Sequence, residues 1–373
     1  MRYYLIAGEA SGDLHASNLM REIKILDQDA VFRCWGGDLM RQQGAELVKH
    51  YRDLAFMGFM EVVSHLPTIL KNFNLCEHDL LAFHPDVLIL IDYPGFNLRM
   101  AKFAAKHGIR VFYYISPQLW AWRSSRVKNV KKWVEKMFVI LPFEQDFYNR
   151  HGYRVDYVGH PLLDVINGDE RAVTRQEFLS ANGLTDRPLV ALLPGSRSME
   201  IKKMLEIMMS IRDCFTGYQF VVAGAPSISG DFYAEILRDS GVGLVMNQTY
   251  DLLSQSAAAL VTSGTATLET ALMGIPQIVC YRGNHFSYLI ARQLVKVKFI
   301  SLVNLISGKM LVPELIQSEL NRENLVHELT AILENESVRE AMKDGYTALK
   351  QNLGGHGASR RAATLMLQYL QEK

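Results

Sequence analysis

The chain has 373 residues, of which 49% are hydrophobic and 21% charged, and its formal net charge is +1. This composition excludes a disordered or fibrous chain, and the balanced charge gives no overall positive field for nucleic acid. The length predicts about two domains, the apolar runs are too short for a membrane helix, and the start does not resemble a signal peptide. Four widely spaced cysteines predict neither a zinc site nor a disulfide framework, so we expect a cytosolic enzyme.

Short β-rich segments alternate with helical segments through the first half of the chain. We predict strands at Tyr3–Ala7, Val31–Trp35, Val87–Asp92, Arg110–Ile115, Lys136–Leu141 and Arg154–Val158. The predicted helices are Asp13–Leu26, Pro67–Phe83, Asn97–His107, Ser124–Trp133 and Phe143–Arg150. Val87–Ile91 is apolar on both faces, which is typical of a parallel strand covered by helices. The alternation predicts a doubly wound α/β layer.

The same pattern restarts after the polar stretch Asn167–Arg187. Strands are predicted at Leu189–Leu193, Gln219–Ala223, Leu244–Met246, Ala258–Thr262 and Gln277–Cys280. The predicted helices are Thr174–Ala181, Met199–Asp213, Asp231–Asp239, Tyr250–Gln255, Thr267–Met273 and Phe286–Val295. We therefore expect two α/β domains, residues 1–165 and 166–344. A helical tail of about 345–373, including the amphipathic Ala358–Gln371, is expected to pack back on the first domain.

The first candidate site is Gly8-Glu9-Ala10-Ser11-Gly12-Asp13-Leu14-His15, directly after the first strand. Glycines permit a tight turn, and the free amides of a helix start favour an anion or a polyhydroxyl ligand. The dinucleotide pattern Gly-x-Gly-x-x-Gly is absent. The alternative is a plain strand-to-helix turn in which Ser11 or Asp13 caps the helix.

The second candidate site is Asp92, at the end of the buried apolar strand. A carboxylate is costly to bury, but at a strand end it could serve as a general base. The alternative is that Asp92 caps the turn before the helix near Asn97. Glu9, at the end of a neighbouring strand, is the competing base.

Two turns in the second half carry groups suited to a nucleotide. Pro194-Gly195-Ser196-Arg197-Ser198 offers amides, hydroxyls and a fixed cation to a phosphate, although Arg197 could instead pair with Glu200 or Glu206. Ser263-Gly264-Thr265 opens a helix that could cradle a diphosphate, with Glu269 within reach of a ribose diol. A capping box between Thr265 and Glu269 is the alternative there.

Two segments suggest contact with lipid. Six basic residues and one acid lie between Arg123 and Lys136, beside Trp120, Trp122 and Trp133. The stretch from Phe56 to Leu66 is unusually apolar. Such features suit an anionic membrane surface or acyl chains, although a solvated helix face and ordinary core packing explain them equally well.

Eight strings in the chain, spread over about residues 1–365, resemble those of lipid-A-disaccharide synthases. They are Gly8-Glu9-Ala10-Ser11-Gly12-Asp13, Gly58-Phe59-Met60-Glu61-Val62, Ser116-Pro117-Gln118-Leu119-Trp120-Ala121-Trp122-Arg123, Leu141-Pro142-Phe143-Glu144, Val158-Gly159-His160-Pro161, Leu193-Pro194-Gly195-Ser196-Arg197, Ser263-Gly264-Thr265-Ala266-Thr267-Leu268-Glu269 and Ser301-Leu302-Val303-Asn304-Leu305. The chain departs from the family at Val303, usually proline, and at Tyr93-Pro94-Gly95, where many members read Ala-Pro-Asp. The leading Asp92 is kept.

The resemblance implies a glycosyltransferase of GT-B architecture, with two facing Rossmann-like domains and the site in the cleft. It implies transfer of 2,3-diacylglucosamine from UDP to the 6-hydroxyl of 2,3-diacylglucosamine 1-phosphate, with inversion and without a divalent metal or a cofactor. The enzyme would rest on the anionic inner face of the inner membrane of a Gram-negative bacterium. Asp92 is favoured as the base over Glu9, and the implied substrate-binding residues are Ser11, Gly12, His15, Ser196, Arg197, Ser263, Gly264, Thr265, Glu269 and Asn304.

The alternative is another UDP-sugar enzyme of this architecture, such as a 2-epimerase or a different hexosaminyltransferase. A membrane scaffold that uses the fold only for binding is a further alternative.

Overall fold

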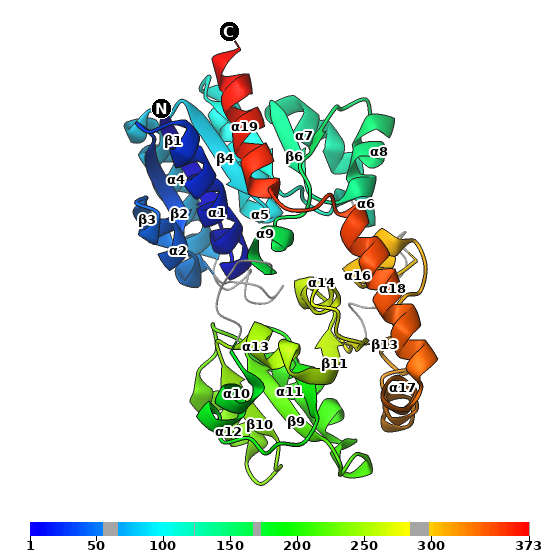
Figure 1. Cartoon of the computed structure of the whole chain (residues 1–373). Coiled ribbons are helices and arrows are strands. Elements are labelled where there is room, and N and C mark those ends of the chain that lie inside the picture. Colours follow the sequence, from blue (N-terminus) through cyan, green and yellow to red (C-terminus); the bar gives the residue numbers. More distant parts are fainter. Residues whose placement is uncertain (55–65, 123, 167–172, 284–297, 373) are drawn as a thin grey trace. The chain divides into compact units, whose positions relative to one another are not determined.

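The computed structural model describes residues 1–54, 66–122, 124–166, 173–283 and 298–372. The chain divides into two compact units (Figure 1). Unit 1 contains Met1–Asp164 and Leu353–Lys373, and unit 2 contains Val165–Asn352. The return to unit 1 begins at Leu353 rather than near residue 345, because helix α18 (Glu336–Asn352) belongs to unit 2 throughout its length.

Unit 1 is built on one parallel sheet. Its strands are β1 (Arg2–Ala7), β2 (Val31–Gly36), β3 (Glu46–His50), β4 (Val87–Ile91), β5 (Arg110–Tyr114), β6 (Lys136–Val139) and β7 (Asp156–Tyr157). Its helices are α1 (Ala10–Leu26), α2 (Asp38–Gln42), α4 (Leu66–Phe83), α5 (Pro94–Lys106), α6 (Leu119–Trp122), α7 (Val127–Trp133), α8 (Pro142–Arg150) and α19 (Ala358–Gln371), while α9 (Leu162–Ile166) ends beyond the unit boundary. The strand order is β3-β2-β1-β4-β5-β6-β7, which is the doubly wound arrangement.

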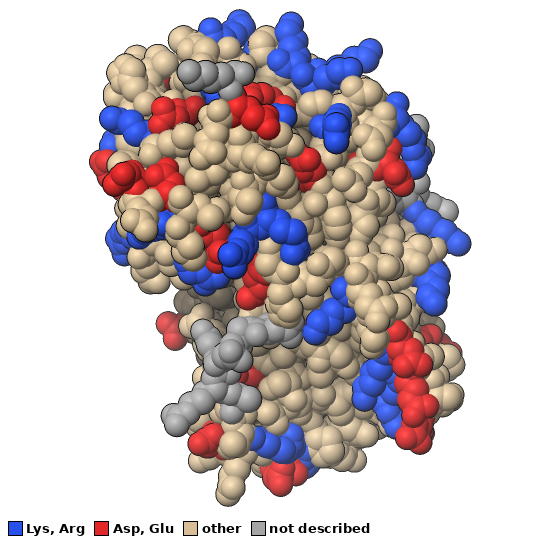
Figure 2. Space-filling model, turned by 45° about the horizontal axis from the view of Figure 1, so that its top comes forward, with Lys and Arg blue, Asp and Glu red and all other residues tan. Residues whose placement is uncertain are grey.

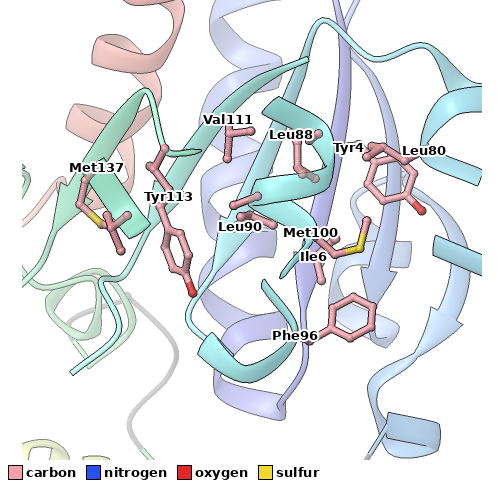
Figure 3. Close-up of a cluster of buried hydrophobic side chains, with 14 of the residues drawn as sticks. Tyr4, Ile6, Leu80, Leu88, Leu90, Phe96, Met100, Val111, Tyr113 and Met137 are labelled. Carbon is pink, nitrogen blue, oxygen red and sulfur yellow. The ribbon is translucent and has the colours of Figure 1, made fainter. Parts of the chain in front are cut away.

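The two faces of this sheet are covered by different helices. On one face, α4, α5 and α7 pack over alternate residues of the strands, which include Tyr4, Ile6, Leu88, Leu90 and Tyr113 (Figure 3). Helices α1 and α19 lie side by side on the other face (Figure 1). Strand β4 is buried along its whole length because helices cover it on both sides, as its unbroken apolar sequence predicts.

Unit 2 repeats this plan with six parallel strands. They are β8 (Leu189–Leu193), β9 (Gln219–Gly224), β10 (Gly243–Met246), β11 (Ser256–Thr262), β12 (Gln277–Tyr281) and β13 (Glu314–Ile316), in the order β10-β9-β8-β11-β12-β13. Besides α18, the described helices are α10 (Arg175–Ala181), α11 (Ser198–Met209), α12 (Gly230–Leu237), α13 (Thr249–Ser254), α14 (Thr265–Leu272), α16 (Leu302–Ser307) and α17 (Arg322–Glu334).

The predicted α/β class with two Rossmann-like units is confirmed, but several elements differ from the prediction. Strands β3 and β13 were not predicted, because one is only partly buried and the other is three residues long. The strand expected at Arg154–Val158 is reduced to Asp156–Tyr157. The helix expected at Phe286–Val295 lies outside the described residues.

Candidate functional site

The carboxyl ends of β1 and β4 form the switch point of unit 1. The two strands are adjacent, and the chain leaves them toward opposite edges of the sheet, from β1 to β2 and from β4 to β5. Ligands of open α/β sheets bind in the crevice at such a point. Glu9 follows β1 and Asp92 follows β4, so the two candidate bases flank this position.

The turn after β1 is fixed by close packing. A Cβ atom on Gly8 would lie 2.3 Å from the ring of Tyr93, so only glycine lets the two turns approach this closely. Glu9 is the N-cap residue of α1 and makes no side-chain cap, and both Glu9 and Ser11 are exposed. Gly12 is buried in the first turn of α1.

Asp13 caps a different helix from the one predicted. Its carboxylate accepts backbone hydrogen bonds from Gly37 at 2.8 Å, Leu39 at 3.1 Å and Met40 at 3.1 Å. It therefore satisfies the free amides at the start of α2 and ties α1 to that helix. The hypothesis that Asp13 or Ser11 caps α1 is wrong.

Asp92 lies in a strained turn. It has φ +43 and Tyr93 has φ +48, so two consecutive residues other than glycine are left-handed, at a cost of about 1–3 kcal/mol each. The side chain of Asn97 holds the turn by donating from Nδ2 to the backbone oxygens of Ile91 at 3.1 Å and Asp92 at 2.8 Å. The N-cap of α5 is Tyr93, which makes no side-chain cap, so Asp92 is not the capping residue.

The surroundings of Asp92 suit a proton acceptor. Burial raises the pKa of its carboxyl to about 7, and the negative charge of Glu9 adds to this shift. The structure thus brings Glu9 and Asp92 within electrostatic reach of each other. A base with a pKa near the working pH gives the best compromise between ionised fraction and proton affinity.

His15 does not share the exposure of Glu9 and Ser11. It is only 5% exposed, and its Nδ1 has no hydrogen-bond partner among the described residues. Burial lowers the pKa of His15 to about 4, and burial together with His15 lowers that of His160 to about 3. Two neutral histidines therefore lie together beneath the start of α1. The contact of His15 with substrate stays a prediction.

The switch point of unit 2 lies between β8 and β11, and it carries the loop Pro194–Ser198. Gly195 has φ +106, and a Cβ atom there would lie 2.8 Å from Oε2 of Glu200. Ser196 and Arg197 are exposed, and Arg197 is the N-cap residue of α11 without a side-chain cap. The charge of Arg197 opposes the rise that burial causes in the pKa of Glu200. Arg197 therefore lies within electrostatic reach of Glu200, and an ion pair with Glu200 or Glu206 stays the alternative to phosphate binding.

The loop after β11 opens α14. Gly264 is the N-cap residue and, like Thr265, is exposed, whereas the Ser263 hydroxyl donates to the Ile300 carbonyl at 3.1 Å. Glu269 accepts a hydrogen bond from the Tyr250 hydroxyl at 3.3 Å, and burial raises its pKa. No side chain caps this helix, so the capping-box alternative is wrong.

The side chain of Asn304 is buried and makes hydrogen bonds to the segment that leads to β13. It is fully buried, its Nδ2 donates to the Val312 carbonyl and the Glu314 carboxylate, and its Oδ1 accepts from the amides of Leu311 and Val312. These bonds occupy the whole amide group. These bonds hold the segment between α16 and β13, and the contact of Asn304 with substrate stays a prediction.

The two segments predicted to contact lipid lie partly outside the described residues. Residues 55–65, which hold most of the apolar stretch and the Gly58–Val62 string, and Arg123 lie outside the described residues. Lys128, Lys131 and Lys132 are exposed on α7, whereas Val127 and Val130 are buried. Among the described residues, no helix combines the length and apolar character of a membrane span. Within the same ranges, no group of three His, Cys, Asp or Glu side chains could hold a metal ion.

Comparison with known proteins gives one consistent family. Residues 3–368 match the family model described as lipid-A-disaccharide synthetase. The chain is 39% identical to the lipid-A-disaccharide synthase of Trichlorobacter lovleyi, with 100% of this chain and 98% of the relative covered. It is 41% identical to that of Syntrophus aciditrophicus, with 97% and 96% covered.

Solved structures show the same fold at low identity. The UDP-GlcNAc 2-epimerase from Neisseria meningitidis bound to UDP-GlcNAc has a TM-score of 0.71 and 13% identity, and the match covers 99% of this chain and 100% of that one. A putative UDP-N-acetylglucosamine 2-epimerase from Listeria monocytogenes has a TM-score of 0.66 and 13% identity, with 100% and 97% covered. Such identities show the shared GT-B fold and do not favour the 2-epimerase alternative.

Proposed function

Because the chain belongs to the lipid-A-disaccharide synthase family of glycosyltransferases, we propose the following donor, acceptor and residue roles. UDP-2,3-diacylglucosamine donates its sugar to the 6-hydroxyl of 2,3-diacylglucosamine 1-phosphate, giving a β(1→6) disaccharide 1-phosphate and UDP. The observation that carries the assignment of roles is a division of chemistry between the units. The switch point of unit 1 presents carboxylates, and that of unit 2 presents open helix starts and an arginine.

Unit 2 is proposed to bind the nucleotide. The exposed helix starts at Arg197 and Gly264 offer amides and positive helix dipoles to a diphosphate. Ser196, Ser263 and Thr265 add hydroxyl groups to the same two loops. Glu269, held by Tyr250, would accept hydrogen bonds from the ribose hydroxyls. The UDP leaving group gains charge in the transition state, so these donors stabilise it more than the ground state.

Unit 1 is proposed to bind the acceptor and supply the base. Asp92 would accept the proton of the 6-hydroxyl as its oxygen attacks C1 of the donor, while the C1–O bond to UDP breaks and UDP leaves with the bonding pair. Inversion follows from this single displacement. Glu9 and Ser11, exposed at the start of α1, would bind acceptor hydroxyl groups. The carboxylate contribution is typically 10²–10⁴-fold in rate.

A membrane surface is the proposed location of the reaction, on the inner face of the inner membrane. Both substrates carry acyl chains, and the three exposed lysines of α7 would face anionic headgroups. In Figure 2, Lys and Arg side chains lie along the upper margin of the face shown. Each basic residue near an anionic surface contributes about 1 kcal/mol.

The membrane proposal is tested by vesicle binding. Replacing Lys128, Lys131 and Lys132 by glutamate should release the protein from phosphatidylglycerol vesicles without lowering its melting temperature. Binding of the unchanged protein should weaken steeply as salt is added. Salt-insensitive binding that survives the triple change would refute the electrostatic attachment.

The reaction is tested with both substrates. The protein is incubated with UDP-2,3-diacylglucosamine and 2,3-diacylglucosamine 1-phosphate, and UDP release and the disaccharide mass are measured. Asp92→Asn should lower turnover about 10²–10⁴-fold and leave UDP affinity unchanged. Asp146→Asn, at an exposed position on α8, is the matched control. An epimerised donor without disaccharide would overturn the proposed transfer.

A further inference from the structure

Glu144 is a buried carboxylate that the proposed mechanism does not use. It is 1% exposed in the first turn of α8, and burial raises its pKa to about 7. Its Oε2 accepts from the amides of Ile140 at 3.2 Å and Leu141 at 3.0 Å. Its Oε1 accepts from the indole N–H of Trp120 at 3.2 Å. A single buried acid therefore joins the end of β6 to the segment after β5.

The same helix fixes the rest of that segment. The hydroxyls of Ser116 and Tyr148 lie 2.7 Å apart, and both residues are buried. The rings of Trp120 and Phe143 pack edge to face with their centroids 4.9 Å apart. Both rings remain half-buried rather than fully enclosed. Glu144 is the N3 residue of the capping box of α8, which accounts for its bond from the Leu141 amide. The bond from the Trp120 indole is additional to that cap, and it keeps the half-buried ring in one orientation.

The segment is next to the Asp92 turn. Strand β5 pairs with β4 on one side and with β6 on the other. The Asp92 amide donates to the Tyr114 carbonyl at 3.2 Å, and the chain continues from Tyr114 into Ser116 and α6. Ile115 between them has φ +66, which is strained for a β-branched residue and redirects the chain at the carboxyl edge of the sheet. Trp120 thus follows the strand beside the proposed base.

We propose that Trp120 is the aromatic platform on which the glucosamine ring of the acceptor lies, and that Glu144 is the positioning residue that holds its indole through the N–H. This inference rests on the proposed function and deepens it, because it assigns a subsite to the acceptor sugar. The apolar C–H face of a pyranose ring packs well on a flat aromatic ring, while hydroxyls at its rim remain free for polar partners. A ring fixed through its own N–H meets the sugar in one orientation, so no rotamer freedom is lost on binding.

The test distinguishes the contribution of the Trp120 ring from that of the hydrogen bond between its indole N–H and Glu144. Trp120→Phe keeps an aromatic ring and removes the N–H, and Glu144→Gln keeps the volume but cannot accept from all three N–H groups. Each should raise the acceptor KM about tenfold, the scale of one hydrogen bond to a charged group. The double variant should be no worse than either single variant, because both remove the same bond. Trp120→Leu should raise the acceptor KM further.

Three measurements make the outcome decisive. Acceptor dissociation constants come from equilibrium binding, UDP affinity from competition, and turnover from UDP release. Asp146→Asn, at an exposed position on α8, is the control that should leave all three unchanged. If the unchanged protein binds the acceptor but releases no UDP, the proposed transfer fails while the platform is still tested by binding. Unchanged acceptor affinity in Trp120→Phe and Trp120→Leu would overturn the inference, as would a loss that disappears with a short-chain acceptor, which would assign Trp120 to the acyl chains.

Discussion

Replacing Glu9 by glutamine should move the acidic limb of the pH–rate profile to lower pH. Burial and the charge of Glu9 together raise the pKa of Asp92 to about 7. A carboxyl must be ionised to accept a proton, so kcat/KM should fall as the pH drops through this value. The Glu9→Gln variant loses the repulsive charge, and its Asp92 should ionise at a lower pH.

The expected loss of activity at low pH follows from the pKa of Asp92. With a pKa of about 7, about one carboxyl in ten is ionised at pH 6, so kcat/KM there should be about a tenth of its plateau. Burial is the largest cause of the shift, so the limb in Glu9→Gln should remain above the ordinary value of 3.8. The ratio of activity at pH 6 to that at pH 8 should therefore be higher in Glu9→Gln than in the unchanged protein.

The assay is UDP release at low substrate, measured from pH 5 to pH 9 at constant ionic strength. Two other groups titrate in this range: the acceptor phosphate, with a second pKa of about 6, and Glu144, with a pKa of about 7. Asp92→Asn serves as the control, because its residual activity should lack the Asp92 limb. If Glu9→Gln leaves the limb unmoved, the limb belongs to one of the other groups and the assignment of the base is refuted.

Arg197→Ala should lower turnover about a hundredfold, the scale expected when one hydrogen-bond donor to the transition state is removed. Glu269→Ala should mainly raise the KM for the UDP-sugar. Unchanged kinetics in both variants would refute the proposed UDP-sugar site. Asp164→Ala should lower unfolding free energy by about 1–2 kcal/mol in urea titration, because its carboxylate accepts from three amides at the start of α19, and equal stability would contradict that capping role. Acidification below about pH 6.5 should lower the unfolding free energy of the unchanged protein more than that of His15→Gln, by about 1.4 kcal/mol per pH unit. The reason is that the pKa of His15 in the folded protein is lowered to about 4. The raised pKa values of Asp92 and Glu144 stabilise both proteins as the pH falls from about 7 to about 4. The quantity to measure is therefore the difference in unfolding free energy between the two proteins at each pH. A difference that stays constant with pH would refute the prediction for His15.

Most of the fold prediction depends on the pattern of hydrophobic residues. Strands such as β4 and β8 are apolar on both faces, and this signal depends only on local sequence. The end of α18 was not predictable in the same way. The helical pattern runs on from Glu336, and only the glycines at positions 354, 355 and 357, all with positive φ, show where the chain turns back to unit 1.

Site positions were predictable where they depend on strand ends, and not where they depend on side-chain partners. Asp92 follows a buried strand, which the sequence shows directly. Asn304 is predicted to contact substrate because its string resembles that of the family, whereas the bonds of its side-chain amide to residues as far as Glu314 have no signal in the sequence. Asn97 was missed although an asparagine soon after a strand-end turn is a usable signal. Glu144 is the capping-box residue of α8, two positions after Pro142, and the sequence pattern indicates the cap but not its burial or its bond to Trp120.

The return of residues 353–372 to unit 1 affects how the chain folds during synthesis. In this arrangement unit 2 is an insertion within unit 1, because every residue of unit 2 lies between two segments of the other unit. The apolar face of α19, with Ala358, Ala362 and Met366, packs beside α1 on a sheet that was made more than 180 residues earlier. That surface stays uncovered until the tail has left the ribosome, whereas unit 2 is already complete. The inserted unit is therefore the first to finish folding, and chaperones that protect nascent apolar surface would act on the unit that begins the chain.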